Sequence, residues 1–183
     1  MCGIVGLFLK DPALESQLGA LLTDMLITMT DRGPDSAGIA IYGGGGEGRG
    51  KITVQSANPG TDFKDLDGDL HAAIGQPVLM LVKDTHAVLE LPLAQLEAAR
   101  SALTHLRPAI KVMSAGESIE IFKEVGLPKD VARRFGVADM KGTHGIGHTR
   151  MATESAVTTM GAHPFSTGAD QCLVHNGSLS NHN

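Results

Sequence analysis

Hydrophobic and polar positions alternate along the chain in patterns that predict short strands separated by a few amphipathic helices. The apolar segment from Cys2 to Leu9 predicts a buried strand. Apolar positions from Leu14 to Met29 follow the spacing of one buried helical face, in a helix that opens at Pro12 and ends before Gly33 and Pro34. Further strands are expected at residues 36–42, 51–57, 77–82, 87–91, 110–113, 118–122, 143–149 and 171–174, and helices at 92–106 and 128–135.

The stretch from about residue 61 to residue 128 differs from the sequence on either side of it. A polar segment leads into two apolar runs, one helix and two more strands, which together form a β-β-α-β-β pattern. We therefore expect an inserted α+β subdomain at about 61–128. The glycine-rich run just before it, residues 43–50, lacks the Gly-Lys-Ser/Thr ending of a phosphate-binding loop, so a hairpin loop is expected there.

Composition narrows the classes of protein that this chain can represent. Its 183 residues are 42% hydrophobic and 19% charged, as in ordinary globular domains. The net charge is −5 with no dense basic cluster, so we expect no nucleic acid as partner. No apolar run reaches the roughly 20 residues of a membrane helix, and no basic segment of a secretory signal precedes the first strand. With only two cysteines, the chain is expected to be cytoplasmic and reduced.

Cys2 is the residue that carries the most chemical information. Initiator Met is usually removed before a small residue, which would leave this cysteine at the N-terminus. A terminal cysteine combines a nucleophilic thiol with an α-amine whose pKa is near 7.7–8.0 and which can act as the base. On position alone, a chance second residue or a cysteine buried in a strand is the favoured explanation of Cys2; three further segments of the sequence reverse this. Cys172, in an apolar strand, is expected to be an inert thiol.

Three further segments follow Cys2-Gly3-Ile4-Val5-Gly6 in the sequence. They are the runs RGPDSAG at 32–38, GHTRMAT at 147–153, and the pair AHP at 162–164 and HNG at 175–177. In order, spacing and residue type they resemble the class II glutamine amidotransferase domain, an N-terminal-nucleophile hydrolase. That family includes the glutaminase domains of amidophosphoribosyltransferase, glucosamine-6-phosphate synthase, asparagine synthetase and glutamate synthase. The resemblance covers residues 2–57 and about 140–183 and leaves the middle of the chain unexplained.

The resemblance implies a fold and a set of roles. The fold would be α+β, a four-layer α/β/β/α N-terminal-nucleophile sandwich over residues 2–183, interrupted by the insertion. Cys2 would attack the glutamine amide, and the Asn176 side chain and the Gly177 N–H would hold the oxyanion. Arg150 would bind the substrate α-carboxylate with help from Thr153. Arg32 and His163 would support the site, and no cofactor is implied.

Two departures from the family pattern limit what the resemblance implies. The family places a further motif with a substrate-binding Asp after His-Asn-Gly, whereas this sequence stops at Asn183, so the domain is expected to be C-terminally truncated. While Met1 stays attached, the Cys2 nitrogen is an amide and cannot act as a base. The expected protein is a glutaminase subunit that supplies ammonia to a partner synthase subunit or domain in a hetero-oligomer. It resembles free-standing glutamate-synthase-like subunits in general terms, since Met151 replaces the Trp common in glucosamine-6-phosphate synthase.

Two other functions remain open. The first is a catalytically inactive, truncated amidotransferase domain that binds or regulates a synthase. The second is a metal hydrolase, because five of the eight histidines lie after residue 143. His144 and His148 are spaced i, i+4, but the intervening Gly-Ile-Gly disfavours the helix that such a zinc site uses, and no Cys or carboxylate completes a ligand set at customary spacing. The sequence therefore predicts no metal.

Overall fold

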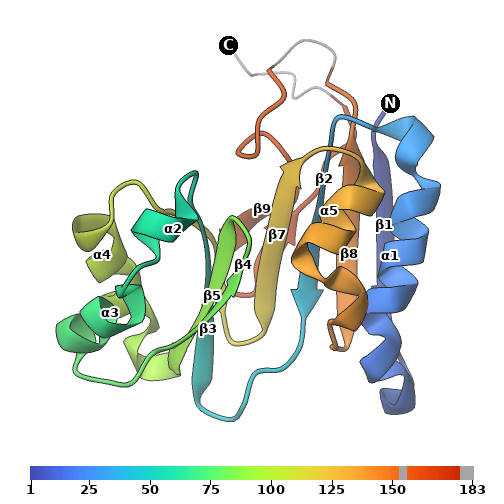
Figure 1. The fold of residues 1–183 in the computed structure, drawn as a ribbon. Coiled ribbons are helices and arrows are strands. Elements are labelled where there is room, and N and C mark those ends of the chain that lie inside the picture. Colours follow the sequence, from blue (N-terminus) through green and yellow to red (C-terminus); the bar gives the residue numbers. More distant parts are fainter. Residues whose placement is uncertain (153–155, 178–183) are drawn as a thin grey trace. The chain divides into compact units, whose positions relative to one another are not determined.

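The computed structural model describes residues 1–152 and 156–177, and its contacts divide the chain into two compact units. The first unit comprises Met1–Ile41, Lys123–Phe165 and Cys172–Asn183, and the second comprises Tyr42–Phe122 and Ser166–Gln171. Each unit has its own sheet and helices (Figure 1). The protein is thus α+β with several antiparallel strand pairs, as predicted at this level.

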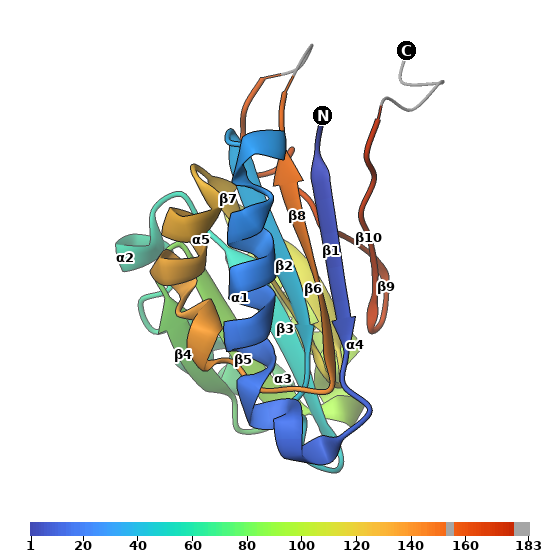
Figure 2. The same cartoon turned by 90° about the vertical axis from the view of Figure 1, so that its right-hand side faces the viewer.

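The first unit is built around a sheet with the strand order β1-β8-β2-β7. These strands are β1 (Gly3–Phe8), β8 (His144–Arg150), β2 (Ser36–Tyr42) and β7 (Ile119–Val125). Helix α1 (Leu18–Thr28) packs on β1 and β8 and beside α5 (Pro128–Phe135), as Figure 2 shows. Short 3-10 helices occupy Pro12–Gln17, Thr30–Arg32 and Val137–Asp139. Strand β1 runs antiparallel to β8 with Gly3 opposite Thr149, so the N-terminus lies beside the end of β8.

Two predictions about this unit need correction. Strand β1 is not buried on both faces, because Ile4 is 41% and Phe8 67% exposed while Gly3 and Val5 are buried. The first helix does not continue from Pro12, since residues 12–17 form a 3-10 helix. The tighter 3-10 turn changes the angular spacing of side chains, and Leu14 lies outside the face on which Leu18, Leu22 and Leu26 are buried.

Gly19 sets how closely α1 approaches the segment before β8. Its N–H donates to the Met140 carbonyl at 3.0 Å, and a Cβ at this position would lie 2.0 Å from the Val137 carbonyl oxygen. We expect Gly19→Ala to lower the free energy of unfolding by about 2–3 kcal/mol, because backbone must move. Gly68→Ala is the matched control, since Gly68 is also helical but faces open space; it should be neutral or stabilising by up to about 1 kcal/mol. Equal effects of both substitutions in urea unfolding would contradict this close-approach account.

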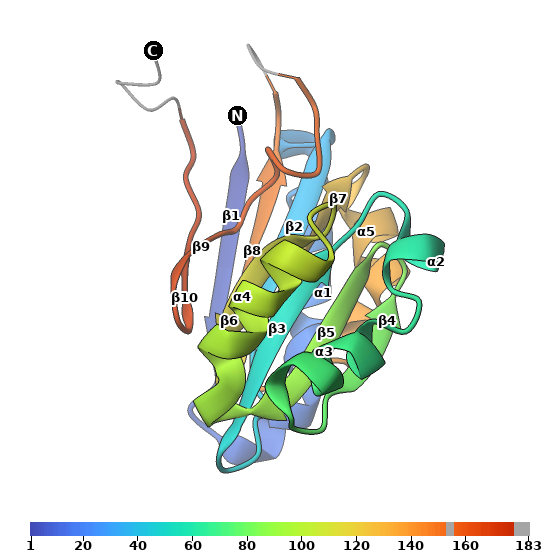
Figure 3. The same cartoon turned by 90° about the vertical axis from the view of Figure 1, so that its left-hand side faces the viewer.

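The second unit contains a sheet with the order β4-β5-β3-β6 and the remaining helices. Its strands are β4 (Leu79–Lys83), β5 (His86–Pro92), β3 (Arg49–Gln55) and β6 (Lys111–Gly116), and its helices are α2 (Pro59–Asp62), α3 (Leu66–Ile74), a 3-10 turn at Leu93–Gln95 and α4 (Leu96–Leu106). Helices α3 and α4 lie side by side, and their apolar faces share one cluster with β3 and β5 (Figure 3). Because Leu70, Leu89 and Leu103 are at most 2% exposed in it, this unit has its own core.

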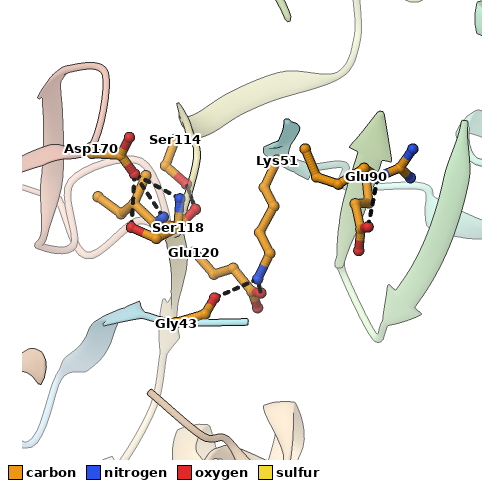
Figure 4. Close-up of polar contacts among 9 residues, drawn as sticks. Gly43, Lys51, Glu90, Ser114, Ser118, Glu120 and Asp170 are labelled. Carbon is orange, nitrogen blue, oxygen red and sulfur yellow. Dashed lines mark hydrogen bonds and ion pairs between the residues drawn. The ribbon is translucent and has the colours of Figure 1, made fainter. Parts of the chain in front are cut away.

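Polar contacts in the second unit hold the segments that lead into β3 and out of β6 (Figure 4). Lys51 is 5% exposed; its Nζ donates to the Gly43 carbonyl at 2.7 Å and pairs with Glu120 at 2.6 Å. The Asp170 carboxylate accepts the backbone N–H groups of residues 117, 118 and 119, and also the Ser118 hydroxyl. Burial alone would raise the pKa of Asp170, but these hydrogen bonds hold it below its usual value.

Helices α2 and α3 and strand β9 (Phe165–Gly168) were not predicted from the sequence, nor were the 3-10 helices at Thr30–Arg32 and Val137–Asp139. Strand β9 forms a two-stranded sheet with β10 (Gln171–Leu173). Strand β3 precedes residue 61 yet pairs with β5 and β6, whereas β7 joins the sheet of β1, β8 and β2. Within the described residues, no helix has the length and apolar character needed to cross a membrane.

Candidate active site

Cys2 lies where the chain enters β1, and two side chains of neighbouring segments hold its backbone. The Gly3 N–H donates to Thr149 Oγ1 at 3.2 Å, and this hydroxyl donates to the Met29 carbonyl at 3.1 Å. A Cβ on Gly3 would lie 2.8 Å from both Met29 Cβ and Thr149 Oγ1, so only glycine fits after the cysteine. Strand pairing with β8 and the bond to Thr149 therefore place Cys2 at a defined position.

The Cys2 side chain is half-buried and faces the loop that follows β8. Its Sγ lies 4.0 Å from the Met151 carbonyl oxygen, to which the thiol can donate. Arg32, at the end of the 3-10 turn after α1, donates through Nε to the Cys2 carbonyl at 3.4 Å. Arg32 thus contacts the cysteine backbone rather than its thiol, and the supporting role expected for it stays a prediction.

Asp35 holds the loop that faces the thiol, and sequence reasoning assigned it no role of its own. Its N–H donates to the Arg150 carbonyl at 3.1 Å, and its Oδ2 accepts the Ala152 N–H at 2.7 Å. Asp35 therefore fixes the backbone on both sides of Met151. Gly33 supports the same arrangement, because a Cβ there would lie 2.5 Å from the Thr149 carbonyl carbon. The sequence signal that could have pointed to Asp35 is its place in the run RGPDSAG, directly after the Gly-Pro turn.

Arg150 is the last residue of β8 and its guanidinium extends over a turn farther along the chain. Nη1 donates to the Ala156 carbonyl at 3.4 Å, and a Cβ on Gly161 would lie 3.1 Å from that same nitrogen. The Gly161 N–H donates to the Thr158 hydroxyl at 3.1 Å, which closes the turn. The glycine leaves room for the guanidinium, which is the type of group that binds a carboxylate in a bidentate manner.

Three histidines form a second group in this unit. His148, in the middle of β8, is fully buried; its Nε2 lies 3.0 Å from the His175 carbonyl oxygen, and its ring stacks on that of His163 with centroids 4.4 Å apart. The His175 Nδ1 lies 3.0 Å from the Gly177 carbonyl oxygen. Gly177 has a φ of +143°, a conformation that favours glycine. The structure thereby brings His163 and the His-Asn-Gly segment to the central strand of the sheet.

Burial and neighbouring positive charge lower the pKa values of His148 and His163. Burial lowers the pKa of His163 to about 4, with contributions from His148, Lys123, Arg150 and His175. The pKa of His148 is also lowered, mainly by burial, although the hydrogen bond to His175 opposes the shift. Lys123, on β7, donates to the Ala162 and Pro164 carbonyls at 2.7 and 3.1 Å, on either side of His163; burial lowers its pKa to about 8.

The residues expected to act together fall into these two groups. Cys2, Arg32 and Arg150 are connected through Met151 and Asp35, while His163 and the Asn176-Gly177 segment are connected through His148. The hydrogen bonds of the described residues link neither Asn176 nor Gly177 to Cys2. Thr153 lies outside the described residues. Over residues 1–152 and 156–177, no three His, Cys, Asp or Glu side chains are grouped so as to hold a metal ion.

Sequence comparison relates this chain to known proteins. Over all 183 residues the chain is 68% identical to the glutamine amidotransferase-like protein GlxB of Rhizobium meliloti, covering 60% of that protein. It is 36% identical over 197 aligned positions to a putative glutamine amidotransferase of Methanothermobacter thermautotrophicus, covering all of this chain and 63% of that protein. A glutamine–fructose-6-phosphate aminotransferase of Streptococcus pyogenes is 38% identical over 68 residues, which are 37% of this chain and 11% of that enzyme. No family profile matches.

These relatives support the presence of a class II glutamine amidotransferase domain in this chain, as its resemblance to that family predicted. The glutamine amidotransferase-like protein GlxB of R. meliloti is similar to all 183 residues of this chain. The chain spans about 60% of the length of the two relatives that match it throughout.

Proposed function

We propose that the protein is a glutaminase subunit that hydrolyses the side-chain amide of glutamine and passes the ammonia to a partner synthase. The observation that carries the proposal is the position of Cys2. Arg32 holds its carbonyl and Thr149 holds the N–H of the next residue, Gly3. Its thiol faces the loop that directly follows Arg150, the last residue of β8. The names of the relatives, glutamine amidotransferase-like protein and putative glutamine amidotransferase, support the same substrate.

The proposed reaction starts after removal of Met1. The Cys2 thiol gives its proton to the freed α-amine, and Sγ attacks the amide carbon of glutamine. The tetrahedral intermediate collapses to a glutamyl thioester as the C–N bond breaks, and the protonated amine of Cys2 supplies the proton that ammonia needs to leave. Water then attacks the thioester, releases glutamate and restores the thiol. Every proton in this cycle is carried by the Cys2 residue, the substrate or water.

Four further residues complete the proposed site. The Asn176 side-chain amide and the Gly177 N–H would donate to the oxyanion, a contribution of about 10²–10³ in rate for each donor in other hydrolases. Arg150 would bind the α-carboxylate of glutamine, and Gly161 leaves space for its guanidinium. Thr153 would assist Arg150.

Fold and assembly are part of the proposal. We propose a four-layer α/β/β/α N-terminal-nucleophile sandwich for the amidotransferase domain, with residues 61–128 as an insertion in it. The ammonia acceptor would be a synthase subunit or domain in a hetero-oligomer. A cytoplasmic location and the absence of a cofactor remain predictions.

The test uses the full-length protein and glutamine labelled with ¹⁵N at the side-chain amide. We expect equal amounts of glutamate and labelled ammonium, measured by NMR, and no hydrolysis of asparagine, whose amide lies one methylene closer to the α-carbon. The contrary outcome is saturable glutamine binding without ammonium release, in protein that lacks Met1 and is tested together with its partner synthase. It would reject the proposed glutaminase activity and favour a binding or regulatory module.

The close approach of Gly161 to Arg150 gives a prediction about substrate affinity. A Cβ there would lie 3.1 Å from Nη1, so Gly161→Ala should displace the guanidinium, a flexible group, without disturbing the backbone. We expect the KM for glutamine to rise roughly tenfold, as for one weakened hydrogen bond to a charged group, with kcat within about twofold. Gly6→Ala is the control, because its Cβ would have only an ordinary contact 4.0 Å from Ile146. A fall in kcat with KM unchanged would contradict the assignment of Arg150.

A further inference from the structure

The segment that carries Asn176 and Gly177 follows β10 and has to be held in place for both groups to face one oxygen atom. Its hydrogen bond to the sheet comes from His148, whose Nε2 lies 3.0 Å from the His175 carbonyl oxygen. A carbonyl oxygen only accepts, so His148 carries its proton on Nε2 and donates. The residue whose carbonyl accepts this hydrogen bond, His175, directly precedes Asn176.

The His148 ring has little freedom to turn away from His175. It is fully buried in the central strand β8 and stacks on the His163 ring at a tilt of 33°. His163 is fixed in turn, because the carbonyls on both sides of it accept from Lys123 Nζ, and its ring packs edge-on against Phe165 at 4.5 Å. The Nδ1 atoms of His148 and His163 are buried and make no hydrogen bond within the described part of the chain. Both rings therefore pack as neutral groups, and the polar contact of His148 is its bond to His175.

We infer that His148 is a positioning residue of the proposed active site: its Nε2–H holds the His175 carbonyl and thereby places the Asn176 amide and the Gly177 N–H. This inference rests on the proposed function. His148 does not contact the substrate in this role; it acts through the backbone. The hydrogen bond between His175 Nδ1 and the Gly177 carbonyl stiffens the same short segment from within.

Substitutions of His148 separate this donor from simple packing. His148→Gln keeps an N–H close to the position of Nε2, whereas His148→Leu fills much of the space without a donor. In the full-length protein we expect the leucine variant to lose about 30- to 100-fold in kcat, as for a displaced oxyanion donor, with the KM for glutamine within about threefold. The glutamine variant should stay within about fivefold of the native kcat. His144→Leu, on the same strand but half-exposed, is the matched control and should leave kcat unchanged.

Two more measurements test the role itself. An aldehyde analogue of glutamine forms a thiohemiacetal whose oxygen occupies the oxyanion position, so it should bind the leucine variant 30- to 100-fold more weakly. Alkylation of Cys2 by iodoacetamide needs no oxyanion donor and should proceed at the native rate. Equal losses in kcat for the glutamine and leucine variants, or a leucine variant with native kcat, would overturn the inference.

Hydrogen exchange gives a readout that does not depend on catalysis. Amides of residues 174–177 should exchange at least about tenfold faster in His148→Leu than in His148→Gln, because the segment has lost its bond to the sheet. If the native protein released no ammonia, the proposed function would fail while this comparison still decided whether His148 holds the segment. Unchanged exchange in the leucine variant would reject the inference in either case.

Discussion

Replacing Cys2 with alanine should remove the glutaminase activity, with kcat falling by at least about 10³-fold, because no other nucleophile is invoked. The Cys2 side chain ends beside the Met151 carbonyl, and its loss leaves the hydrogen bonds of the backbone through Thr149 and Arg32 in place. The variant should therefore fold like the native protein and still bind glutamine. Initial rates of ammonium release, measured with glutamine at saturation, check the expected loss.

The matched control for this variant is Cys172→Ala. Cys172 is the other cysteine of the chain and is half-buried in β10. No catalytic or binding role has been given to it, so we expect native kcat and KM. Activity retained in Cys2→Ala and lost in Cys172→Ala would contradict the assignment of the nucleophile.

Replacing Arg150 with glutamine should lower kcat/KM for glutamine by about 10²–10³-fold. The expected size corresponds to the loss of two charge-assisted hydrogen bonds to one carboxylate, partly offset by water. Arg150→Lys should fall between the native protein and the glutamine variant, since an ammonium group keeps the charge but not the planar fork. Steady-state kinetics on all three proteins give the comparison.

A substrate without the α-carboxylate identifies what Arg150 binds. 4-Aminobutanamide keeps the amide and the amine of glutamine and lacks that carboxylate. The native protein should hydrolyse 4-aminobutanamide about as poorly as Arg150→Gln hydrolyses glutamine. Both reactions lack the contact between Arg150 and the α-carboxylate. Arg133→Gln, which removes an exposed arginine from α5, is the control for a change in net charge. If Arg150→Gln had a much lower kcat/KM for 4-aminobutanamide than the native protein, Arg150 would act on a part of the substrate other than the α-carboxylate.

The positions of most strands along the chain could be predicted from local sequence patterns, whereas their order in the sheets could not. The predicted ranges for β2 and α5 coincide with the structure, since the run from Ser36 to Tyr42 carries no charged residue and Pro128 and Gly136 mark the ends of the helix. Helix α3 was missed because Asp65, Asp67, Gly68 and Asp69 mask the two apolar positions, Leu66 and Leu70, that it buries. Its stability comes from packing against α4, which no local pattern reports.

Sequence reasoning singled out some residues of the candidate site and missed others, because local patterns do not report contacts between distant parts of the chain. Cys2, Arg32 and Arg150 could be singled out because each belongs to a run of residues that resembles a family motif. Asp35 and His148 act through backbone groups far away in the sequence, Ala152 and His175, and such contacts depend on strand register and chain path. His148 was considered as a metal ligand, whereas in the structure its Nε2 is engaged by a carbonyl oxygen.

The state of the N-terminus decides whether the proposed chemistry is possible. With Met1 present, its ammonium group lies 3.2 Å from Met151 Sδ, and the Cys2 nitrogen is part of a peptide bond. Removal of Met1 frees the amine on the same residue as the thiol. Processing is therefore expected to switch the site from inactive to active without any other change in sequence.

The most direct measurement is the intact mass of the full-length protein before and after exposure to a diazo-ketone analogue of glutamine. We expect a starting mass without Met1, followed by one covalent adduct that forms in competition with glutamine and is absent from Cys2→Ala. A protein that lacks Met1, holds its fold and stays unmodified at saturating analogue would contradict the account of Cys2 as the nucleophile of a glutamine site.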